Sequence, residues 1–222
     1  MHYEIGARPA ILRHDPFKAI VVPRPIGWIG TVSPDGVNNL APYSFFNALS
    51  DAPPVVVFSS SGHKDSLRNV EATGEFTCSI ATYALREQMS LSSATVPESV
   101  DEFAMTGLTA APSNYVRAPR VAQSPVALEC RLWKMLPMPV PPGRTEPVWT
   151  AVFGLVVGVY IDDSVLRDGM LDIAAIQPIA RMGYMDYSVT RADTLFTLNR
   201  PEVGPDGQLK TPSAQKWDGV YR

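Results

Sequence analysis

The segment IGWIGTVSPDGVNNLAP, residues 26–42, has the pattern of a β-hairpin. Residues 26–32 are mostly apolar or β-branched, which favours a strand. The next four residues, Ser33-Pro34-Asp35-Gly36, form a turn signature, because proline presets φ for the bend and glycine accepts a positive φ. Residues 37–42 can then return as the antiparallel partner. The segment therefore predicts two paired strands joined by a tight turn.

Strand patterns recur along the rest of the chain. Residues 54–59 and 75–81 are further strand-like runs. In residues 126–132 most alternate side chains are apolar, which is the period of a half-buried strand. Residues 148–161 are apolar enough for a strand buried on both faces, and residues 193–199 predict a short last strand. Together with the hairpin, these segments predict a strand-dominated fold.

The predicted helices are few and short. The first covers residues 66–73, with Asp65 or Ser66 as its N-cap and Gly74 as its stop. The others are residues 83–91, 101–105 and 171–176. The 21 prolines are spread throughout the chain and disfavour long helices. We therefore predict a mainly β fold with peripheral α-helices, and an antiparallel barrel rather than a doubly wound sheet.

Length and composition are those of an ordinary globular chain. The 222 residues, 45% hydrophobic and 18% charged, suffice for one large domain. The proline-rich loop at residues 137–147 reads as a surface excursion within it. We expect a single domain over residues 1–222, with a core at about residues 18–201 and extended tails. The net charge of −3, without a cluster of Lys and Arg among aromatic residues, makes nucleic acid a poor partner.

Neither a membrane span nor a signal peptide is expected. The N-terminus lacks the basic start, apolar core and small-residue cleavage site of a signal peptide. The longest apolar run, residues 148–161, is shorter than the roughly 20 residues of a spanning helix, and its Gly154 and Gly158 indicate a buried strand relieved by glycine. The expected compartment is the cytoplasm. A reducing cytoplasm favours buried free thiols at Cys78 and Cys130, with a disulfide between them as the alternative.

No strong catalytic motif is present in the sequence. We find no G-x-S-x-G, Walker-type loop, H-E-x-x-H, C-x-x-C or G-x-G-x-x-G. His2, His14 and His63 are too far apart in sequence to indicate a metal site. Ser59 and His63 are within reach of each other, but no oxyanion-hole motif or third member accompanies them. We therefore assign no catalytic residue and no metal ligand.

Residues 58–70, FSSSGHKDSLRNV, concentrate small polar side chains between two apolar segments. Hydroxyls at residues 59–61, Lys64 and a helix start near Ser66 are the kinds of donor that a phosphate dianion needs. In a barrel, further polar side chains could converge on them: Arg24, Arg68 and the serines of residues 90–93. The segment is thus either a phosphate site or a plain loop with an Asp or Ser helix cap.

Residues 40–50, LAPYSFFNALS, place aromatic and polar side chains directly after a predicted strand. The residues concerned are Tyr43, Ser44, Phe45, Phe46 and Asn47. Aromatic residues in such a position are normally part of the core. A flat heteroaromatic ligand would also need rings, exposed backbone amides and an amide side chain.

The order of three motifs, PRPIGW (residues 23–28), NLAPYSFFN (residues 39–47) and KDSLRN (residues 64–69), resembles the flavin reductase-like family of FMN-binding split barrels. The resemblance runs from Pro23 to Pro201 and includes SLSSATVPESVDEFAMTGLTAAP, residues 90–112. It implies a six-stranded antiparallel Greek-key split β-barrel with added helices. It also implies a homodimer with FMN near the subunit interface.

The resemblance assigns FMN contacts position by position. The isoalloxazine ring would lie along Ser44, Phe45, Phe46 and Asn47. The ribityl chain and phosphate would meet Ser59, Ser60, Lys64, Asp65 and Ser66, with Ser92 and Ser93 approaching the phosphate. Trp28 and Thr31 would be flavin neighbours on the first strand. Arg181 and Tyr184 fit less well, because RMGY departs from the glycine-rich pattern of the family.

The implied activity is hydride transfer from NADH or NADPH to bound FMN. Electrons would then pass to free flavin, to a partner oxygenase or to another acceptor. The alternative is a flavoredoxin-like electron carrier that a partner protein reduces. A third use of such a barrel, haem binding, lacks a well-placed histidine.

Overall fold

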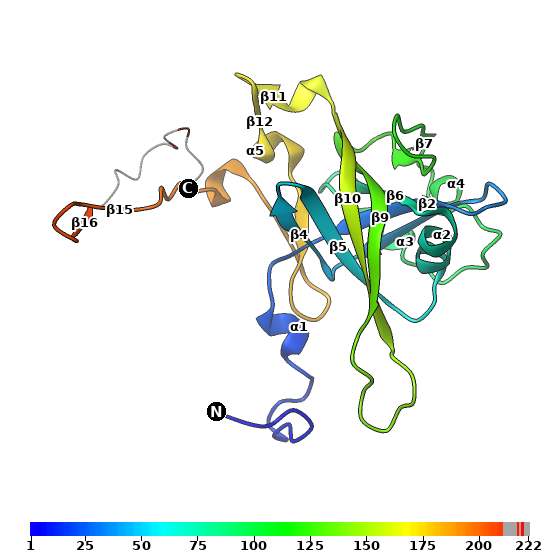
Figure 1. Cartoon of the computed structure of the whole chain (residues 1–222), viewed down its shortest axis with the longest axis horizontal. Coiled ribbons are helices and arrows are strands. Elements are labelled where there is room, and N and C mark those ends of the chain that lie inside the picture. The colour runs from blue at the N-terminus through cyan, green and yellow to red at the C-terminus, as the bar shows by residue number, and fades with distance from the viewer. Residues whose placement is uncertain (211–216, 218, 220–222) are drawn as a thin grey trace.

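The computed structural model describes residues 1–210, 217 and 219, and strands dominate it (Figure 1). Seven strands form one antiparallel sheet in the order β3-β2-β6-β9-β10-β5-β4. They are β2 (Gly27–Val32), β3 (Asn38–Tyr43), β4 (Phe46–Asp51), β5 (Pro54–Ser61), β6 (Glu75–Ile80), β9 (Val126–Pro137) and β10 (Trp149–Ile161). The prediction of a mainly β, antiparallel split barrel is confirmed, but the predicted number of six strands is wrong. The segment read as a ligand-facing stretch after β3 contains β4, which pairs with β5.

The sheet curls because its two edge strands are consecutive in the chain. The edges are β3 and β4, and only Ser44 and Phe45 separate them. So short a connection brings the edges of the sheet together, although no ladder joins them. The chain therefore crosses the split of the barrel at residues 44–45.

The hairpin at residues 26–42 is confirmed. Val32 lies opposite Asn38 and Gly27 opposite Tyr43, and the Ser33 amide donates to the Val37 carbonyl at 2.8 Å. Gly36 has φ 88°, which is the left-handed conformation that the turn needs.

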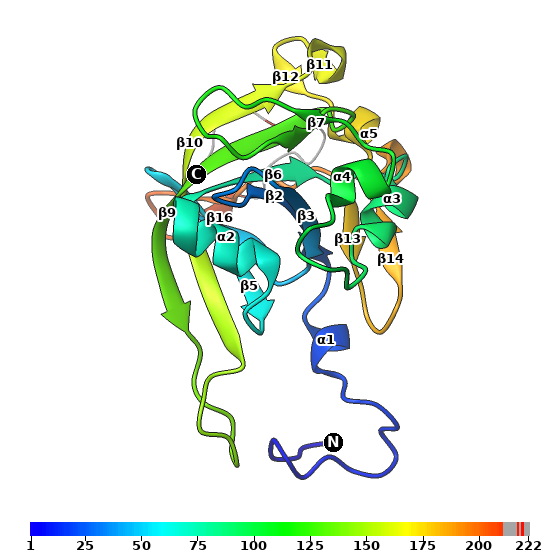
Figure 2. The ribbon, with the colours of Figure 1, turned by 90° about the vertical axis from the view of Figure 1, so that its right-hand side faces the viewer.

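A long ribbon of β9 and β10 leaves the barrel at its lower end in Figures 1 and 2. The two strands pair from Ile161 opposite Val126 to Thr150 opposite Pro137, so the proline-rich loop is an excursion between partners, as predicted. Burial on both faces of β10 was predicted and is wrong for its C-terminal half, where Val159 is 57% exposed.

The two glycines of β10 make room for aromatic rings. A Cβ added at Gly154 would lie 2.2 Å from the Phe76 ring, and one at Gly158 would lie 2.3 Å from the Tyr115 ring. The interpretation of G-x-x-x-G as a strand relieved by glycine therefore has a direct physical cause.

The helices are peripheral and short, as predicted. They are α1 (Phe17–Ile20), α2 (Asp65–Thr73), α3 (Arg86–Leu91), α4 (Glu102–Met105) and α5 (Ile173–Ile176), with 3₁₀ turns η1 (Asp163–Val165) and η2 (Ala192–Thr194). Gly74, with φ 72°, ends α2 as expected, but the N-cap is Lys64, and no side chain caps the helix. The strand predicted at residues 193–199 is wrong: its start is η2, and residues 195–199 form neither strand nor helix.

Short strand pairs complete the structure. They are β1 (Arg24–Pro25) with β13 (Ile179–Arg181) and β14 (Tyr187–Val189), β7 (Ala110–Ala111) with β8 (Arg120–Val121), β11 (Leu166–Arg167) with β12 (Met170–Leu171), and β15 (Glu202–Val203) with β16 (Leu209–Lys210). The N-terminal segment and the segment carrying β15 and β16 extend away from the barrel (Figure 1). Among the described residues, no helix has both the length and the apolar character to cross a membrane.

Two apolar clusters lie on the two faces of β2. Ile29 belongs to a cluster with Phe58 and Phe76, whereas its neighbour Trp28 belongs to a second cluster under α3 and α4. Cys78 and Cys130 are buried free thiols in the first cluster, which confirms the favoured prediction. Burial raises the pKa of the Cys78 thiol to about 12, so this thiol is inert at neutral pH.

Candidate functional site

A cleft of about 800 Å³ opens beside the split of the barrel. Its walls come from residues 41–45 at the β3–β4 junction, from the end of β5 and the start of α2, and from the loop of residues 92–98. Trp149 of β10, Lys18 of α1, Asn39 of β3 and Glu102 of α4 also line it. Segments from both edges of the sheet therefore share one polar cleft.

The structure brings eight of the thirteen sequence-predicted residues to this lining. They are Ser44, Phe45, Ser59, Lys64, Asp65, Ser66, Ser92 and Ser93. The convergence of the serines at 92 and 93 with Lys64 is the arrangement that we expected a barrel to produce. The other five, Trp28, Thr31, Phe46, Asn47 and Ser60, lie outside the lining.

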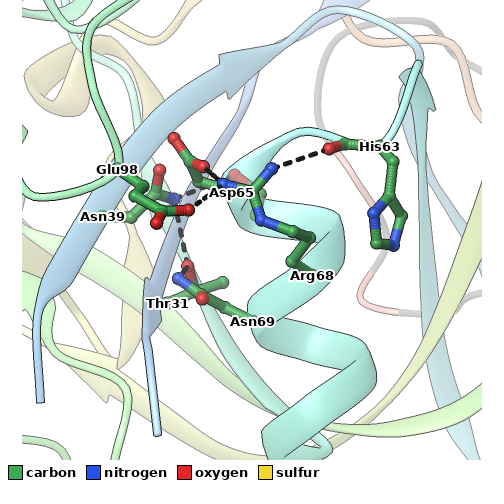
Figure 3. Close-up of polar contacts among 8 residues, drawn as sticks. Thr31, Asn39, His63, Asp65, Arg68, Asn69 and Glu98 are labelled. Atoms are coloured by element: carbon green, nitrogen blue, oxygen red, sulfur yellow. Dashed lines mark hydrogen bonds and ion pairs between the residues drawn. The ribbon is translucent and has the colours of Figure 1, made fainter. Parts of the chain in front are cut away.

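Thr31 lies beneath the cleft and is fully buried. Its Oγ1 accepts hydrogen bonds from the Nδ2 groups of Asn39 and Asn69, both at 3.0 Å (Figure 3). Asn39 Nδ2 also donates to Ser66 Oγ at 2.9 Å. Thr31 therefore positions Ser66 through Asn39 and does not itself reach the cleft.

Trp28 has a similar supporting place under the opposite wall. Its Nε1 donates to Ser92 Oγ at 2.9 Å, and that hydroxyl donates to the Met89 carbonyl at 2.9 Å. Because Trp28 is fully buried, this hydrogen bond is shielded from water and holds the start of the 92–98 loop.

Phe46, Asn47 and Ser60 lie outside the lining, and for Ser60 the reason is that side chains alternate between the faces of β5. Phe46 packs against the core, so closely that a Cβ at Gly27 would meet its ring at 2.5 Å. Asn47 is exposed, and its Oδ1 accepts from the Ala48 amide at 2.9 Å. Ser60 is fully buried and donates to the Gly62 carbonyl at 3.2 Å, whereas its neighbours on β5 face the cleft.

The start of α2 presents unpaired donors to the cleft. No side chain caps the helix, so the positive end of its dipole and its first amides are available to an anion. None of the ion pairs among the described residues involves Lys64. These donors, with the hydroxyl of Ser66, match the acceptor-rich phosphate group.

Tyr43 adds a buried polar atom without a partner. The residue lines the cleft and is 8% exposed, and its hydroxyl lies beside the hydroxyls of Ser60 and Ser66 without a well-formed hydrogen bond among the described residues. Burial raises the pKa of this hydroxyl, which keeps it protonated and able to donate.

Arg68 connects two walls of the cleft (Figure 3). Its Nη1 donates to the His63 carbonyl at 2.9 Å, while Nη2 pairs with the carboxylates of Asp65 and, at 2.9 Å, Glu98. The His63 ring pairs with the Glu71 carboxylate at 2.9 Å. Among the described residues it makes no hydrogen bond to a serine hydroxyl. The Ser59–His63 pairing is therefore not formed.

Charge in the cleft is balanced. Three cationic side chains, Lys18, Lys64 and Arg68, line it together with three carboxyl groups. The carboxyl groups are those of Asp65, Glu98 and Glu102. Glu102 is buried, accepts from the Leu40 amide at 3.0 Å, and has its pKa raised mainly by burial. A protonated Glu102 would leave the cleft net positive.

Aromatic rings flank the other end of the cleft. The rings of Phe45 and Trp149 meet edge to face with centroids 5.0 Å apart, and the Arg24 guanidinium lies 5.9 Å from the Phe45 centroid. Arg24 donates to the carbonyls of Val21 and Met182, so it ties neighbouring segments together and does not line the cleft. Arg181, which donates to the Tyr184 carbonyl at 2.6 Å, also lies outside the lining.

Several lining residues had not been assigned from the sequence. They are Lys18, Asn39, Glu98, Glu102 and Trp149. These residues come from distant segments, and no local pattern marks them. Ser61, one of the three hydroxyls that the sequence offered at residues 59–61, also lines the cleft. No three His, Cys, Asp or Glu side chains in the described part of the chain come close enough together to hold a metal ion.

The model of the flavin reductase like domain matches residues 19–177. The chain belongs to the flavin reductase-like family. A family relative from Deinococcus radiodurans is 36% identical over 211 residues, which cover 90% of this chain and 89% of the relative.

Two solved structures extend the comparison with the family. A split-barrel protein from Shewanella frigidimarina superposes with a TM-score of 0.77 at 26% identity, covering 90% of this chain and 99% of its own. Flavoredoxin from Desulfovibrio vulgaris (Miyazaki F) gives 0.70 at 26% identity, covering 86% and 93%. The family is one of flavin-binding proteins. The cleft combines an uncapped helix start, a lysine, serine hydroxyls and aromatic rings, which are the kinds of group that suit a phosphate-bearing aromatic ligand.

Proposed function

We propose that this protein is an FMN-dependent oxidoreductase of the NAD(P)H:flavin reductase type. The observation that carries the proposal is the convergence in one cleft of the uncapped start of α2, Lys64 and the hydroxyls of Ser59 and Ser66. Membership of the flavin reductase-like family supports the same ligand.

In this proposal Lys64, the Ser66 hydroxyl and the first amides of α2, including that of Asp65, hold the phosphate end, and Ser93 approaches it from the facing loop. The Asp65 carboxylate pairs with Arg68. Ser59 meets the ribityl chain, and Ser44 and Phe45 lie along the ring system beside Trp149. Thr31 and Trp28 are positioning residues, since they act through Asn39 and Ser92. Phe46, Asn47 and Ser60 are left without a direct contact.

The chemistry that FMN supplies when bound is acceptance of a hydride from NADH or NADPH and delivery of electrons to an acceptor. The chain contributes binding and orientation: donors fix the phosphate end while aromatic rings define the plane at the other end. No side chain is needed as a general acid or base for that hydride step. We therefore propose no catalytic residue.

The likeness to flavoredoxin favours a second candidate function, an FMN-binding electron carrier reduced by a partner protein. Both functions use the same cleft and differ only in the electron donor. The discriminating property is whether a nicotinamide alone reduces the bound flavin.

Assembly and location complete the proposal. We propose a single domain that acts as a cytoplasmic homodimer and passes electrons to an oxygenase or another acceptor. Exposed apolar side chains on the segment after η2, such as Phe196 (82% exposed) and Leu198 (77%), support association with a second copy. Sedimentation at micromolar concentration would test it, and a monomer would contradict the dimer.

The deciding experiment is an anaerobic titration of the FMN-loaded protein with NADH and with NADPH, followed at the visible absorption band of the flavin. Rapid bleaching by either nicotinamide supports the reductase. A yellow protein that neither nicotinamide bleaches supports the carrier. Failure of the protein to retain or bind FMN at all would refute both.

A further inference from the structure

An ion pair crosses the mouth of the proposed phosphate end of the cleft. Arg68 lies on the first turn of α2, and Glu98 lies at the end of the facing loop of residues 92–98 (Figure 3). Arg68 Nη2 donates to Glu98 Oε2 at 2.9 Å, and both residues line the cleft. Among the described residues, Glu98 is therefore tied to α2 only through Arg68, and Arg68 also lines the cleft.

The guanidinium of Arg68 is already engaged. Its two terminal nitrogens donate to the His63 carbonyl and to two carboxylates, those of Asp65 and Glu98. Asp65 is three residues away on the same helix and stays beside Arg68 whatever the loop does. Glu98 is different, because its side chain is 78% exposed and comes from another segment.

Carboxylate and phosphate oxygens compete for the same donors, because the planar guanidinium recognises both in the same geometry. A phosphate held by the start of α2 would also face the negative charge of Glu98. We propose that Glu98 is a built-in competitor of the ligand phosphate at Arg68, and that it lowers the preference of the cleft for phosphate-bearing over phosphate-free flavins. This inference rests on the proposed function, since it concerns the same site.

The alternative is that Arg68 and Glu98 form an ordinary exposed ion pair that affects neither stability nor ligand binding measurably. The chain offers a matched control for it. Glu87 pairs with Arg86 at 3.1 Å and its side chain is 76% exposed, close to the values for Glu98, but Glu87 does not line the cleft. Neutralising Glu87 changes net charge and removes one surface ion pair without touching the proposed site.

The test compares the affinities of FMN and riboflavin, which lacks the phosphate, for wild type, Glu98→Gln and Glu87→Gln by flavin fluorescence quenching. Glu98→Gln should bind FMN about two- to fivefold more tightly, the range of a released exposed ion pair, and should bind riboflavin as wild type does. The gain should shrink at high salt. It should also be smaller in an Arg68→Gln background, where no ion pair is left to release and only the direct repulsion between Glu98 and the phosphate remains. Glu87→Gln should change neither affinity.

Two outcomes would overturn the inference, and they differ. If wild type binds FMN and Glu98→Gln leaves the ratio of FMN to riboflavin affinity unchanged or lowers it, Glu98 is not a competitor, while the proposed function stands. If none of the variants binds FMN, the proposed function fails, and the inference fails with it.

Discussion

Replacing Thr31 by valine should destabilise the protein and loosen the cleft, although Thr31 itself does not line it. Valine keeps the shape of threonine but has no acceptor. Two buried N–H groups, those of Asn39 and Asn69, would lose the Oγ1 that accepts from both at 3.0 Å. The three residues are no more than 8% exposed, so water cannot replace the lost acceptor.

The magnitude follows from the number of orphaned donors. A buried donor without an acceptor costs about 1–3 kcal/mol. Asn39 retains its bond to Ser66 Oγ, so the larger share of the cost falls on Asn69, and we expect a loss of about 2–4 kcal/mol in the free energy of unfolding. Thr31→Ser is the matched control, because it keeps the acceptor and deletes one buried methyl, at a cost of about 1 kcal/mol.

Urea unfolding of wild type, Thr31→Val and Thr31→Ser, with equal m-values, measures the two costs. FMN affinity provides the second readout: valine should weaken binding through a less ordered Asn39 and Ser66, and serine should not. If Thr31→Val is as stable as Thr31→Ser, the hydroxyl is not the central acceptor of this network and the reasoning is refuted.

Three further predictions test other parts of the structure. Lys64→Ala should weaken FMN binding while the circular dichroism spectrum stays that of wild type; unchanged affinity would remove Lys64 from the phosphate end. Gly154→Ala should lower stability by about 1–3 kcal/mol, because the new Cβ meets the Phe76 ring at 2.2 Å, and an equally stable variant would show that this ring moves freely. Burial raises the pKa of Glu102, so the folded state holds its proton more tightly than the unfolded chain does. The contribution of Glu102 to the free energy of unfolding is full below the pKa that Glu102 has in the unfolded chain. It is lost as the pH rises through the higher pKa of Glu102 in the folded state. Glu102→Gln should flatten that decline in urea unfolding from about pH 4 upward, and an unchanged slope would mean that another group causes it.

The elements that the sequence predicted well are those with a local physical signal. The hairpin at residues 26–42 has a turn that only certain residues can form, and Gly74 ends α2 because it accepts a positive φ. The missed strand β4 shows the limit: its residues 46–51 are mostly exposed, so they lack the alternation that marks a half-buried strand. It pairs with β5 as a local hairpin across residues 52–53.

The N-cap of α2 shows the same limit at a smaller scale. Asp65 and Ser66 are good capping residues, yet Lys64 takes the position and Asp65 pairs with Arg68 instead. A helix start left without a side-chain cap is a poor local solution. The missing cap has a physical reason in the tertiary structure, where the start of α2 lines a cleft and its free amides can face a ligand.

By itself the sequence determined the family, the antiparallel character of the fold and the two segments that carry most of the cleft. It did so because a strand period, a turn and a run of small polar residues are all properties of neighbouring residues. Only the tertiary structure decided which side chains face the cleft and which support it from below. Thr31 and Asn69 are 38 residues apart, and Trp28 and Ser92 are 64 apart, yet each pair forms one buried hydrogen bond. Such contacts depend on where the curled sheet brings distant segments together, and no pattern among neighbouring residues encodes them.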